Sequence, residues 1–443
     1  MIEGFLYSIE LIDDLFWSYI GIPAILILGT YISFKFGWFQ IKYFPLIMKN
    51  FFGYLFHKPV HHERGVAPLQ AFFASVSGCI GIGNIVGVCT AVQIGGPGAV
   101  FWMWVTALVG MVIKYAEVYL GLKFRIKNKD NSYDGGPMYF LQKICKNVWL
   151  PRIFCIFMCI YGVEIYMFRI ITRSISYTWN INYCWTTLFL LAATLIIGQG
   201  GVRLVGKVSS ILIPLFISFF VFVSLYIFSL YSSEIPGMLQ TIITSAFSGH
   251  AAAGAFAGSS IILTMSNGMK RAAYTGDIGV GYASIIHSES EETHPTKQAS
   301  LSIVGIFIDT FVICTISVFL ILLTGTWNAG FHESVVLAEA IRPFIPGIVY
   351  IWPIFLFLLG YSSLIAFFAA GRKAAIFLSK KYGVKLYFLY AFCAFLFFSY
   401  YGEERHSLMI MSIAAICLLI INLVALIFLQ KDIEFDKKSL TIN

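Results

Sequence analysis

The chain has 443 residues, of which 59% are hydrophobic and only 12% are charged. A soluble domain carries roughly 25% charged residues, so this chain has too few charges to cover a surface that faces water. The net charge of +8 does not indicate a nucleic-acid partner, because the basic residues lie in short loops between apolar runs, without a basic face interleaved with aromatic residues. The composition therefore predicts a protein embedded in a lipid bilayer.

Apolar runs long enough to cross a bilayer recur along the whole chain. They cover about residues 15–36, 67–94, 97–122, 148–178, 183–199, 208–231, 239–270, 299–325, 346–371, 386–401 and 407–429. Each is expected to be a helix, because a helix satisfies its own backbone N–H and C=O groups inside lipid. The first run should be retained, since the acidic start of the chain lacks the basic region of a signal peptide. We predict an all-α polytopic membrane protein with about eleven transmembrane helices.

The loop charges predict the orientation. Lys and Arg cluster at 35–64, 123–129, 203–207, 270–271, 372–385 and 431–438. With eleven spans and an outside N-terminus, all six clusters fall on the cytoplasmic side, as the positive-inside rule requires. We therefore predict a multi-pass protein of the cell membrane with a cytoplasmic C-terminus.

Two of the apolar runs differ from the others by their glycines. The second run contains Gly78, Gly81 and Gly83, and the seventh contains Gly254 and Gly258 within a stretch of small residues. Glycine inside a helix costs about 1 kcal/mol relative to alanine, and clustered glycine lets the backbone leave helical geometry. Close packing of helices through small residues is one interpretation, and an interruption of both helices is the other.

The order of these two runs favours interruption. If the first helix is set aside as an extra, the glycine-rich runs become helices 1 and 6 of ten, which are corresponding positions in two five-helix halves. This arrangement is typical of inverted-repeat transporters. The predicted organisation is an extra helix with a cytoplasmic interfacial segment at 1–65, a first repeat at 66–231, a second repeat at 237–429 and a cytoplasmic tail at 430–443.

Three stretches resemble the alanine or glycine:cation symporter family. They are SGCIGIGNIVGVCTAVQIGGPGAVFWMWVTALVGMVIKYAEVYLGLKFR (77–125), DGGPMYF (134–140) and HPTKQASLSIVGIFIDTFVICTISVFLILLTG (294–325). The segment AFSGHAAAGAFAG (246–258) looks like the sixth core helix of that family. The resemblance implies the five-plus-five fold of leucine-type sodium symporters, with discontinuous core helices 1 and 6. It also implies uptake of small neutral amino acids, driven by Na⁺ or H⁺ through alternating access, by a monomer without a cofactor.

The resemblance further implies two binding sites. A sodium ion would lie between the hydroxyl groups of Ser362 and Ser363 and the carbonyl groups of Ser77, Ile80 and Leu359. A hard cation prefers several such oxygen ligands. The substrate would contact Gly78, Gly81, Gly83 and Asn84 on core helix 1, and Gly254, Phe256 and Gly258 on core helix 6. Since glycines leave room for backbone amides to meet a carboxylate, the pocket suits a small side chain.

Several positions depart from the family pattern and leave the substrate open. Phe168 stands where the family carries a glutamine, and Thr275–Gly279 replaces the family's Ser-Asn-Glu-Ala-Gly. After Ser363, the family's Gly-Trp becomes Ala366-Phe367. A symporter of the same fold with another small metabolite as its substrate is therefore the alternative within transport.

Charged residues inside apolar runs must find partners, because an ionised side chain at mid-membrane costs at least a few kcal/mol. Lys114 and Glu117 are three residues apart on one helix and can pair, and we expect Glu117 to be structural. Glu164 is a candidate proton carrier. Asp309 is expected to serve packing or gating.

A membrane-embedded enzyme or a channel is the alternative outside secondary transport. An enzyme would need convergent catalytic groups, but the chain contains no HExxH motif and no nucleophile elbow. A channel would carry currents that are not tied to substrate flux. We therefore predict a transporter rather than an enzyme.

Overall fold

The computed structural model describes residues 11–56, 65–129, 131–145, 148–248, 261–402 and 404–440. Helices dominate these residues, and the two short strands β1 (Ile126–Lys127) and β2 (Tyr133–Asp134) pair antiparallel. The helices of the first half are α2 (Ile22–Lys35), α3 (Phe39–Lys42), α4 (Phe44–Phe56), α5 (Pro68–Cys79), α6 (Gly87–Gly95), α7 (Ala99–Lys123), α8 (Pro137–Ile144), α9 (Trp149–Tyr161), α10 (Ile165–Trp179), α11 (Tyr183–Gln199) and α12 (Gly201–Leu230).

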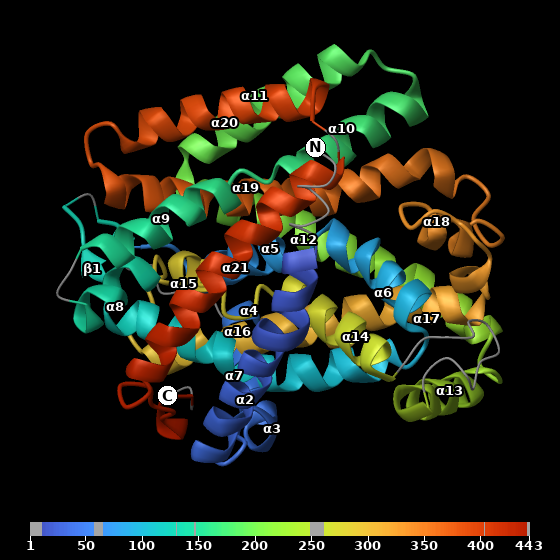
Figure 1. The fold of residues 1–443 in the computed structure, drawn as a ribbon, viewed down its shortest axis with the longest axis horizontal. Helices are drawn as coiled ribbons and strands as arrows, with labels where there is room; N and C mark the ends of the chain where they lie inside the picture. The colour runs from blue at the N-terminus through green and yellow to red at the C-terminus, as the bar shows by residue number, and fades with distance from the viewer. Residues whose placement is uncertain are drawn as a thin grey trace.

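The second half continues the helical pattern. Its helices are α13 (Ile235–Ser248), α14 (Ile261–Thr275), α15 (Tyr282–His287), α16 (Pro295–Ile306), α17 (Thr315–Leu323), α18 (Val336–Ile341), α19 (Ile348–Leu378), α20 (Gly383–Tyr400) and α21 (Glu404–Phe428). A π-helix at Phe307–Cys314 joins α16 to α17, and another at Trp17–Gly21 precedes α2. Figure 1 shows β1 and α8 at one end of the molecule, with α13 and α18 at the other.

Eight helices of the described chain are long and apolar enough to cross a membrane, and the bent pair of α5 and α6 makes a ninth. Each of these nine coincides with one of the eleven spans predicted from the sequence. Helix α11 coincides with a tenth predicted span, although it is shorter, at 17 residues. The remaining predicted span, 239–270, contains residues 249–260, which lie outside the described residues. The polytopic all-α class is confirmed, whereas the count of eleven stays a prediction.

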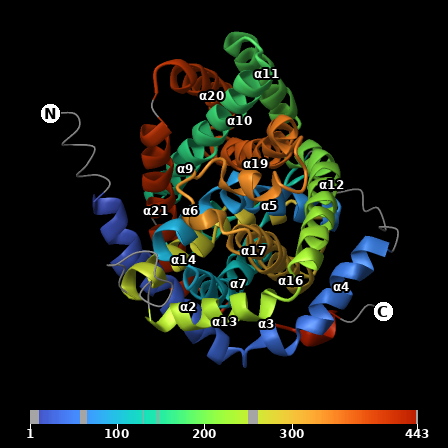
Figure 2. The same cartoon turned by 90° about the vertical axis from the view of Figure 1, so that its right-hand side faces the viewer.

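The spans divide into an inner group and an outer group. Figure 2 shows α5, α7, α14 and α16 in the interior, with α2, α11, α12, α20 and α21 around them. Within the apolar 18-residue stretch of each helix, 83% is buried in α19 and 72% in α7. The buried share is only 33% in α12 and in α20. On α12 the exposed positions carry large apolar side chains, including Ile211, Leu215, Phe222 and Leu225. Such a stripe on a helix already packed on one side is a lipid-facing surface.

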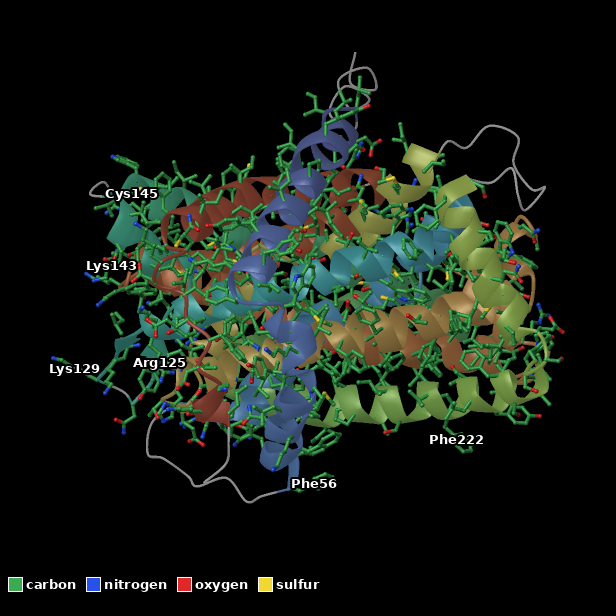
Figure 3. The ribbon with its side chains drawn as sticks, turned by 90° about the horizontal axis from the view of Figure 1, so that it is seen from below. Phe56, Arg125, Lys129, Lys143, Cys145 and Phe222 are labelled. Carbon is green, nitrogen blue, oxygen red and sulfur yellow. The ribbon has the colours of Figure 1, made fainter. Side chains whose placement is uncertain are left out.

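Basic residues from the stretch between α7 and α9 lie at one end of the molecule. Figure 3 shows Arg125, Lys129 and Lys143 together there, while Phe222 projects from the side of α12. Lys35, at the end of the first span, donates to the carbonyl of Gln430, which follows the last span. The location of the basic loops on one membrane side stays a prediction.

One basic cluster does not share that side, and the prediction for it is wrong. Lys270 forms ion pairs with Asp13 (3.1 Å) and Asp14 (2.8 Å), which begin the first span, whereas Lys35 ends it. Lys270 therefore lies toward the opposite end of that span from Lys35. The error arose because Lys270 and Arg271 look like a loop cluster in the sequence, although both belong to α14.

Candidate functional site

The interruption predicted in the second span is present. Helix α5 ends at Cys79, and Gly81 takes an extended conformation before a 3₁₀ turn at Ile82–Asn84. The backbone amide of Gly81 donates to the Asn84 side chain (3.0 Å), which replaces a lost helical hydrogen bond. The halves α5 and α6 are bent by 57°. The glycine cluster therefore breaks the helix, and close packing alone does not explain it.

A second interruption lies between α14 and α15, about twenty residues after the predicted one. The chain from Thr275 to Tyr282 leaves helical geometry, with positive φ at Asp277 (46°), Gly279 (79°) and Gly281 (86°). Glycine adopts such angles without strain, and aspartate tolerates them better than most residues. The predicted positions Gly254, Phe256 and Gly258 lie outside the described residues, so their role stays a prediction.

The two interrupted helices run antiparallel and their breaks meet. The Thr264 hydroxyl donates to the Gly95 carbonyl (2.8 Å), and the Tyr282 hydroxyl donates to the Ala74 carbonyl (2.8 Å). Between these contacts, the thiol of Cys79 lies 3.7 Å from the carbonyl oxygen of Gly276. The chains approach so closely at Gly78 that a Cβ there would lie 2.5 Å from the Tyr282 ring.

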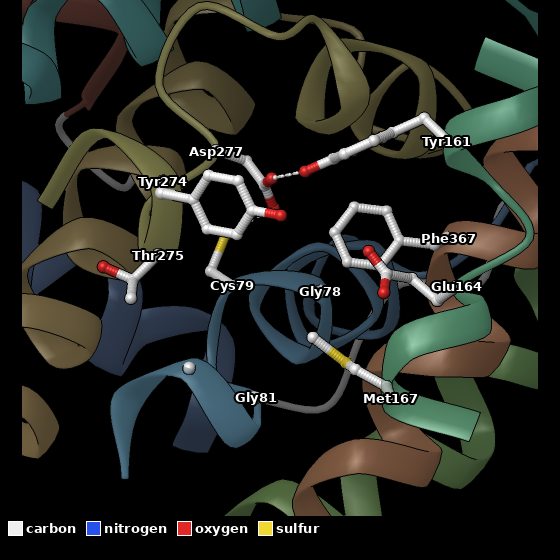
Figure 4. A pocket seen from close by; sticks show the side chains of 11 residues that line it. Gly78, Cys79, Gly81, Tyr161, Glu164, Met167, Tyr274, Thr275, Asp277 and Phe367 are labelled. Carbon is white, nitrogen blue, oxygen red and sulfur yellow. Dashed lines mark hydrogen bonds between the residues drawn. The ribbon is translucent and has the colours of Figure 1, made fainter. Parts of the chain in front are cut away.

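A small cavity of about 30 Å³ lies at the level of the two breaks (Figure 4). By size it accommodates only a few water-sized groups. Its lining comes from α5 and its break, the junction of α9 and α10, the end of α14 with its break, and α19. The lining residues are Gly78, Cys79, Gly81, Gly83, Tyr161, Glu164, Met167, Tyr274, Thr275, Asp277 and Phe367.

The predicted sodium ligands converge on one hydroxyl beside this cavity. The Ser363 Oγ lies 2.6 Å from the Ser77 carbonyl oxygen, 3.4 Å from that of Ile80 and 3.1 Å from that of Leu359. Ser363 is fully buried. By contrast, the Ser362 hydroxyl donates to Leu359 of its own helix (2.8 Å). Four of the five predicted ligands are thus brought together, and Ser362 lies beside them on α19.

The structure gives Asn84 a position other than the cavity wall. Its side-chain amide donates to the carboxylate of Asp309 (2.5 Å), which also accepts from the Thr310 hydroxyl (2.8 Å). Asp309 lies in the π-helix between α16 and α17 and is fully buried. Asn84 and Asp309 therefore tie the break of core helix 1 to the helix formed by α16 and α17, which is core helix 7. The three predicted glycines of core helix 1 remain as cavity lining.

Lys114 and Glu117 form hydrogen bonds with other residues and not with each other. Glu117 accepts hydrogen bonds from the Asn422 side chain (2.8 Å) and the Gly281 amide (3.1 Å), so it holds the second break against α21. Lys114 donates to the Cys79 thiol (2.9 Å) and to the Gly276 carbonyl. It therefore bridges the two breaks.

Sequence reasoning missed the importance of Asp277. This carboxylate is buried in the second break, accepts a hydrogen bond from Tyr161 (2.7 Å) and lies 3.8 Å from the Cys79 thiol. The signal was present as three glycines at 276, 279 and 281 around one acidic residue. Phe168, at the expected glutamine position, instead stacks on Phe395 of α20 (4.4 Å between ring centroids) and does not line the cavity.

A bundle of membrane-spanning helices whose two antiparallel broken members enclose a small buried cavity defines a secondary transporter of the LeuT-like class. The fold is also that of a manganese transporter from Eremococcus coleocola. Two of its crystal structures superpose with TM-scores of 0.53 and 0.55 at 15% and 14% identity, over 82% and 84% of this chain and 78% and 81% of theirs.

The chain belongs to the sodium:alanine symporter family, whose family model matches residues 3–438. It is therefore a transporter of a sodium-coupled amino-acid symporter family and not an enzyme. It is 32% identical to an uncharacterized transporter of Haemophilus influenzae, over 96% of this chain and 94% of that protein. It is 28% identical to the sodium/alanine symporter AgcS of Methanococcus maripaludis (98% and 97% covered) and 26% identical to a probable sodium/glutamine symporter of Bacillus subtilis, GlnT (90% and 76% covered).

Proposed function

We propose that this protein imports a small neutral amino acid, alanine or glycine, together with Na⁺ by alternating access. The observation that carries the proposal is the convergence of the Ser363 hydroxyl on the carbonyl oxygens of Ser77, Ile80 and Leu359 at the break of core helix 1. These oxygens are neutral, so a monovalent ion can bind there without leaving a buried carboxylate behind when it departs.

The site couples the ion to the substrate through shared backbone. Ser77 and Ile80 flank Gly78, and Gly81 follows directly, so the cavity and the ion site use the same five-residue segment. An ion that fixes these carbonyls also fixes the glycines against which the substrate packs. A Cβ on Gly81 would lie 2.7 Å from the Ser363 Oγ, so the two sites are in contact.

The residues of the cavity wall support a small substrate. Glycines form the wall on core helix 1, while Met167 and Phe367 close the side toward α10 and α19. Large side chains close the wall opposite the glycines, so a substrate with a small side chain, such as alanine or glycine, suits this site better than glutamine does. The relative named for glutamine nevertheless makes glutamine the competitor to test.

The test is uptake of radiolabelled alanine into proteoliposomes, with and without an inward sodium gradient and with unlabelled glycine or glutamine as competitor. We expect sodium-dependent accumulation that glycine inhibits more strongly than glutamine. Ser363→Ala should raise the sodium concentration for half-maximal uptake roughly tenfold or more, because a hydrogen-bonding group to a charged partner contributes about 1.5–3 kcal/mol.

Ser224→Ala is the matched control. Ser224 is equally buried but donates only to Phe220 of its own helix α12 (2.7 Å). It should leave the sodium dependence unchanged. Equal sodium dependence in the Ser363 and Ser224 variants would contradict the proposed ion site.

A further inference from the structure

Glu164 occupies an unusual place in the cavity wall. It lies between α9 and α10, where the chain leaves helical geometry from Gly162 to Glu164, with ψ of 71° at Glu164 itself. Gly162 permits this turn to approach α19, since a Cβ there would lie 2.8 Å from the Gly371 Cα. The turn directs the Glu164 carboxylate into the cavity beside Phe367 and Met167 (Figure 4).

The carboxylate of Glu164 lacks a cationic partner in the described part of the chain. Its residue is only 4% exposed, and none of the ion pairs formed there includes it. The backbone amide of Met167 faces it, but this neutral group does not balance a negative charge. A buried carboxylate without a cationic partner is energetically costly, and a positively charged ligand would remove that cost.

The other ionisable groups near Glu164 do not supply that charge. Asp277 is a second carboxylate, and the hydroxyl of Tyr161 is donated to Asp277. Tyr274 and Cys79 also line the cavity as neutral groups. Lys114 reaches Cys79 and the Gly276 carbonyl, next to Asp277, so its charge balances Asp277 and leaves that of Glu164 open.

The opposite side of the cavity has the opposite polarity. The Arg271 guanidinium of α14 donates to the carbonyl of Gly83 (2.5 Å) and lies directly over Gly87 at the start of α6. Arg271 is one turn from Thr275, and Thr275 faces Glu164 across the cavity in Figure 4. The cavity therefore has the Glu164 carboxylate at one side, while behind Gly83 at the other side lie the Arg271 cation and the start of α6. This arrangement is complementary to the two charges of a zwitterion.

We infer that the Glu164 carboxylate binds the ammonium group of the transported amino acid, with the substrate carboxylate toward the Gly83 side. This assignment rests on the proposed function and deepens it. It makes Glu164 a specificity-determining residue. A substrate must carry a positive amine, and a hydroxy acid of the same size should be rejected because Glu164 would be left without its charge partner.

The test compares Glu164→Gln with Thr172→Val in proteoliposomes. Thr172 is a buried polar residue of α10, the helix that Glu164 precedes, but it donates to the Phe168 carbonyl (2.8 Å) and does not line the cavity. For Glu164→Gln, we expect the KM for alanine to rise roughly tenfold or more, with an unchanged sodium concentration for half-maximal uptake. Lactate has a hydroxyl group in place of the ammonium group of alanine. In the Glu164→Gln variant, lactate should inhibit alanine uptake more strongly, relative to glycine, than it does in the unaltered protein. Thr172→Val should leave KM and this ratio within about twofold.

Glu164→Asp, which keeps the charge, is expected to recover part of the alanine affinity, and this variant guards against a misfolded glutamine variant. An unchanged KM in a folded Glu164→Gln protein would overturn the inference while the proposed function stands. A variant altered only in its pH dependence would also overturn it, since the carboxylate would then bind a proton. Absence of any amino-acid uptake by the unaltered protein would overturn the proposed function and this inference together.

Discussion

Lys373 is the cation of a buried ionic cluster with Asp134 and Glu289. Its replacement tests how much this cluster contributes to the stability of the fold. Its ammonium lies 2.7 Å from Asp134, contacts Glu289 and donates to the Tyr133 carbonyl (3.2 Å). The three charged side chains are only 8–9% exposed. The cluster joins α19 to strand β2 and to the chain after α15. Replacement by methionine keeps the length of the side chain and removes its charge.

The expected cost follows from the two carboxylates that remain. Removing one member of a buried ion pair typically costs about 3–5 kcal/mol, because the partner charge stays buried without compensation. For a chain of 443 residues this corresponds to roughly 3–5 °C in melting temperature. A triple variant that also carries Asp134→Asn and Glu289→Gln removes the uncompensated charges. It should recover most of the loss.

The assay is thermal unfolding of the purified protein in detergent micelles, followed by intrinsic fluorescence. Lys380→Met is the control, because Lys380 is exposed. It should change the melting temperature by less than a degree. The expectation would be refuted if Lys373→Met had the same melting temperature as the unaltered protein. It would also be refuted if the triple variant were no more stable than Lys373→Met, because unpaired carboxylates could then not cause the loss of stability.

Two further substitutions test other contacts. Gly87→Ala would place a Cβ 1.8 Å from the Arg271 Cζ, so the guanidinium must leave the Gly83 carbonyl. We expect alanine uptake to fall at least tenfold with a retained melting temperature, and normal uptake would contradict the assigned contact. Asn422→Leu removes a donor from the buried carboxylate of Glu117. It should lower stability by about 1–3 kcal/mol, measured as the melting temperature, and an unchanged value would show that the Gly281 amide is sufficient.

The helices could be predicted from the sequence because lipid imposes one rule on every span. The apolar runs at 97–122 and 346–371 became α7 and α19 within a few residues of their predicted starts. Helix α19 continues to Leu378, since its last turns carry Lys373 into the buried cluster. Hydropathy alone gives no sign of this extension.

The break of core helix 1 could be predicted because three glycines lie within six residues of an apolar run. The described second break was not predicted, because the alanine and glycine run at 246–258 is the more conspicuous one in the sequence. The described break at Gly276–Gly281 owes its shape to positive φ angles and to tertiary contacts of Asp277 with Tyr161. Contacts between residues more than a hundred positions apart leave no local pattern.

More of the residues predicted for the ion site lie together than of those predicted for the substrate cavity. The paired serines on α19 point to the helix-1 carbonyls by family resemblance, and Ser363 lies against them. Asn84 was assigned to the substrate but holds Asp309, because the 3₁₀ turn after Gly81 rotates its side chain toward core helix 7. The direction of a side chain beyond a break depends on the turn that follows, which the sequence does not specify.

The ion pairs of Lys270 have a mechanical consequence. They attach α14, one half of an interrupted helix, to Asp13 and Asp14 near the N-terminus. The helix they fasten, α2, is itself clamped on α7, where a Cβ on Gly29 would lie 2.6 Å from the Val109 carbonyl oxygen. Any tilt of α14 must either pull the N-terminal helix along or break two charge contacts. The N-terminal helix thus restrains the movement of α14 relative to α7.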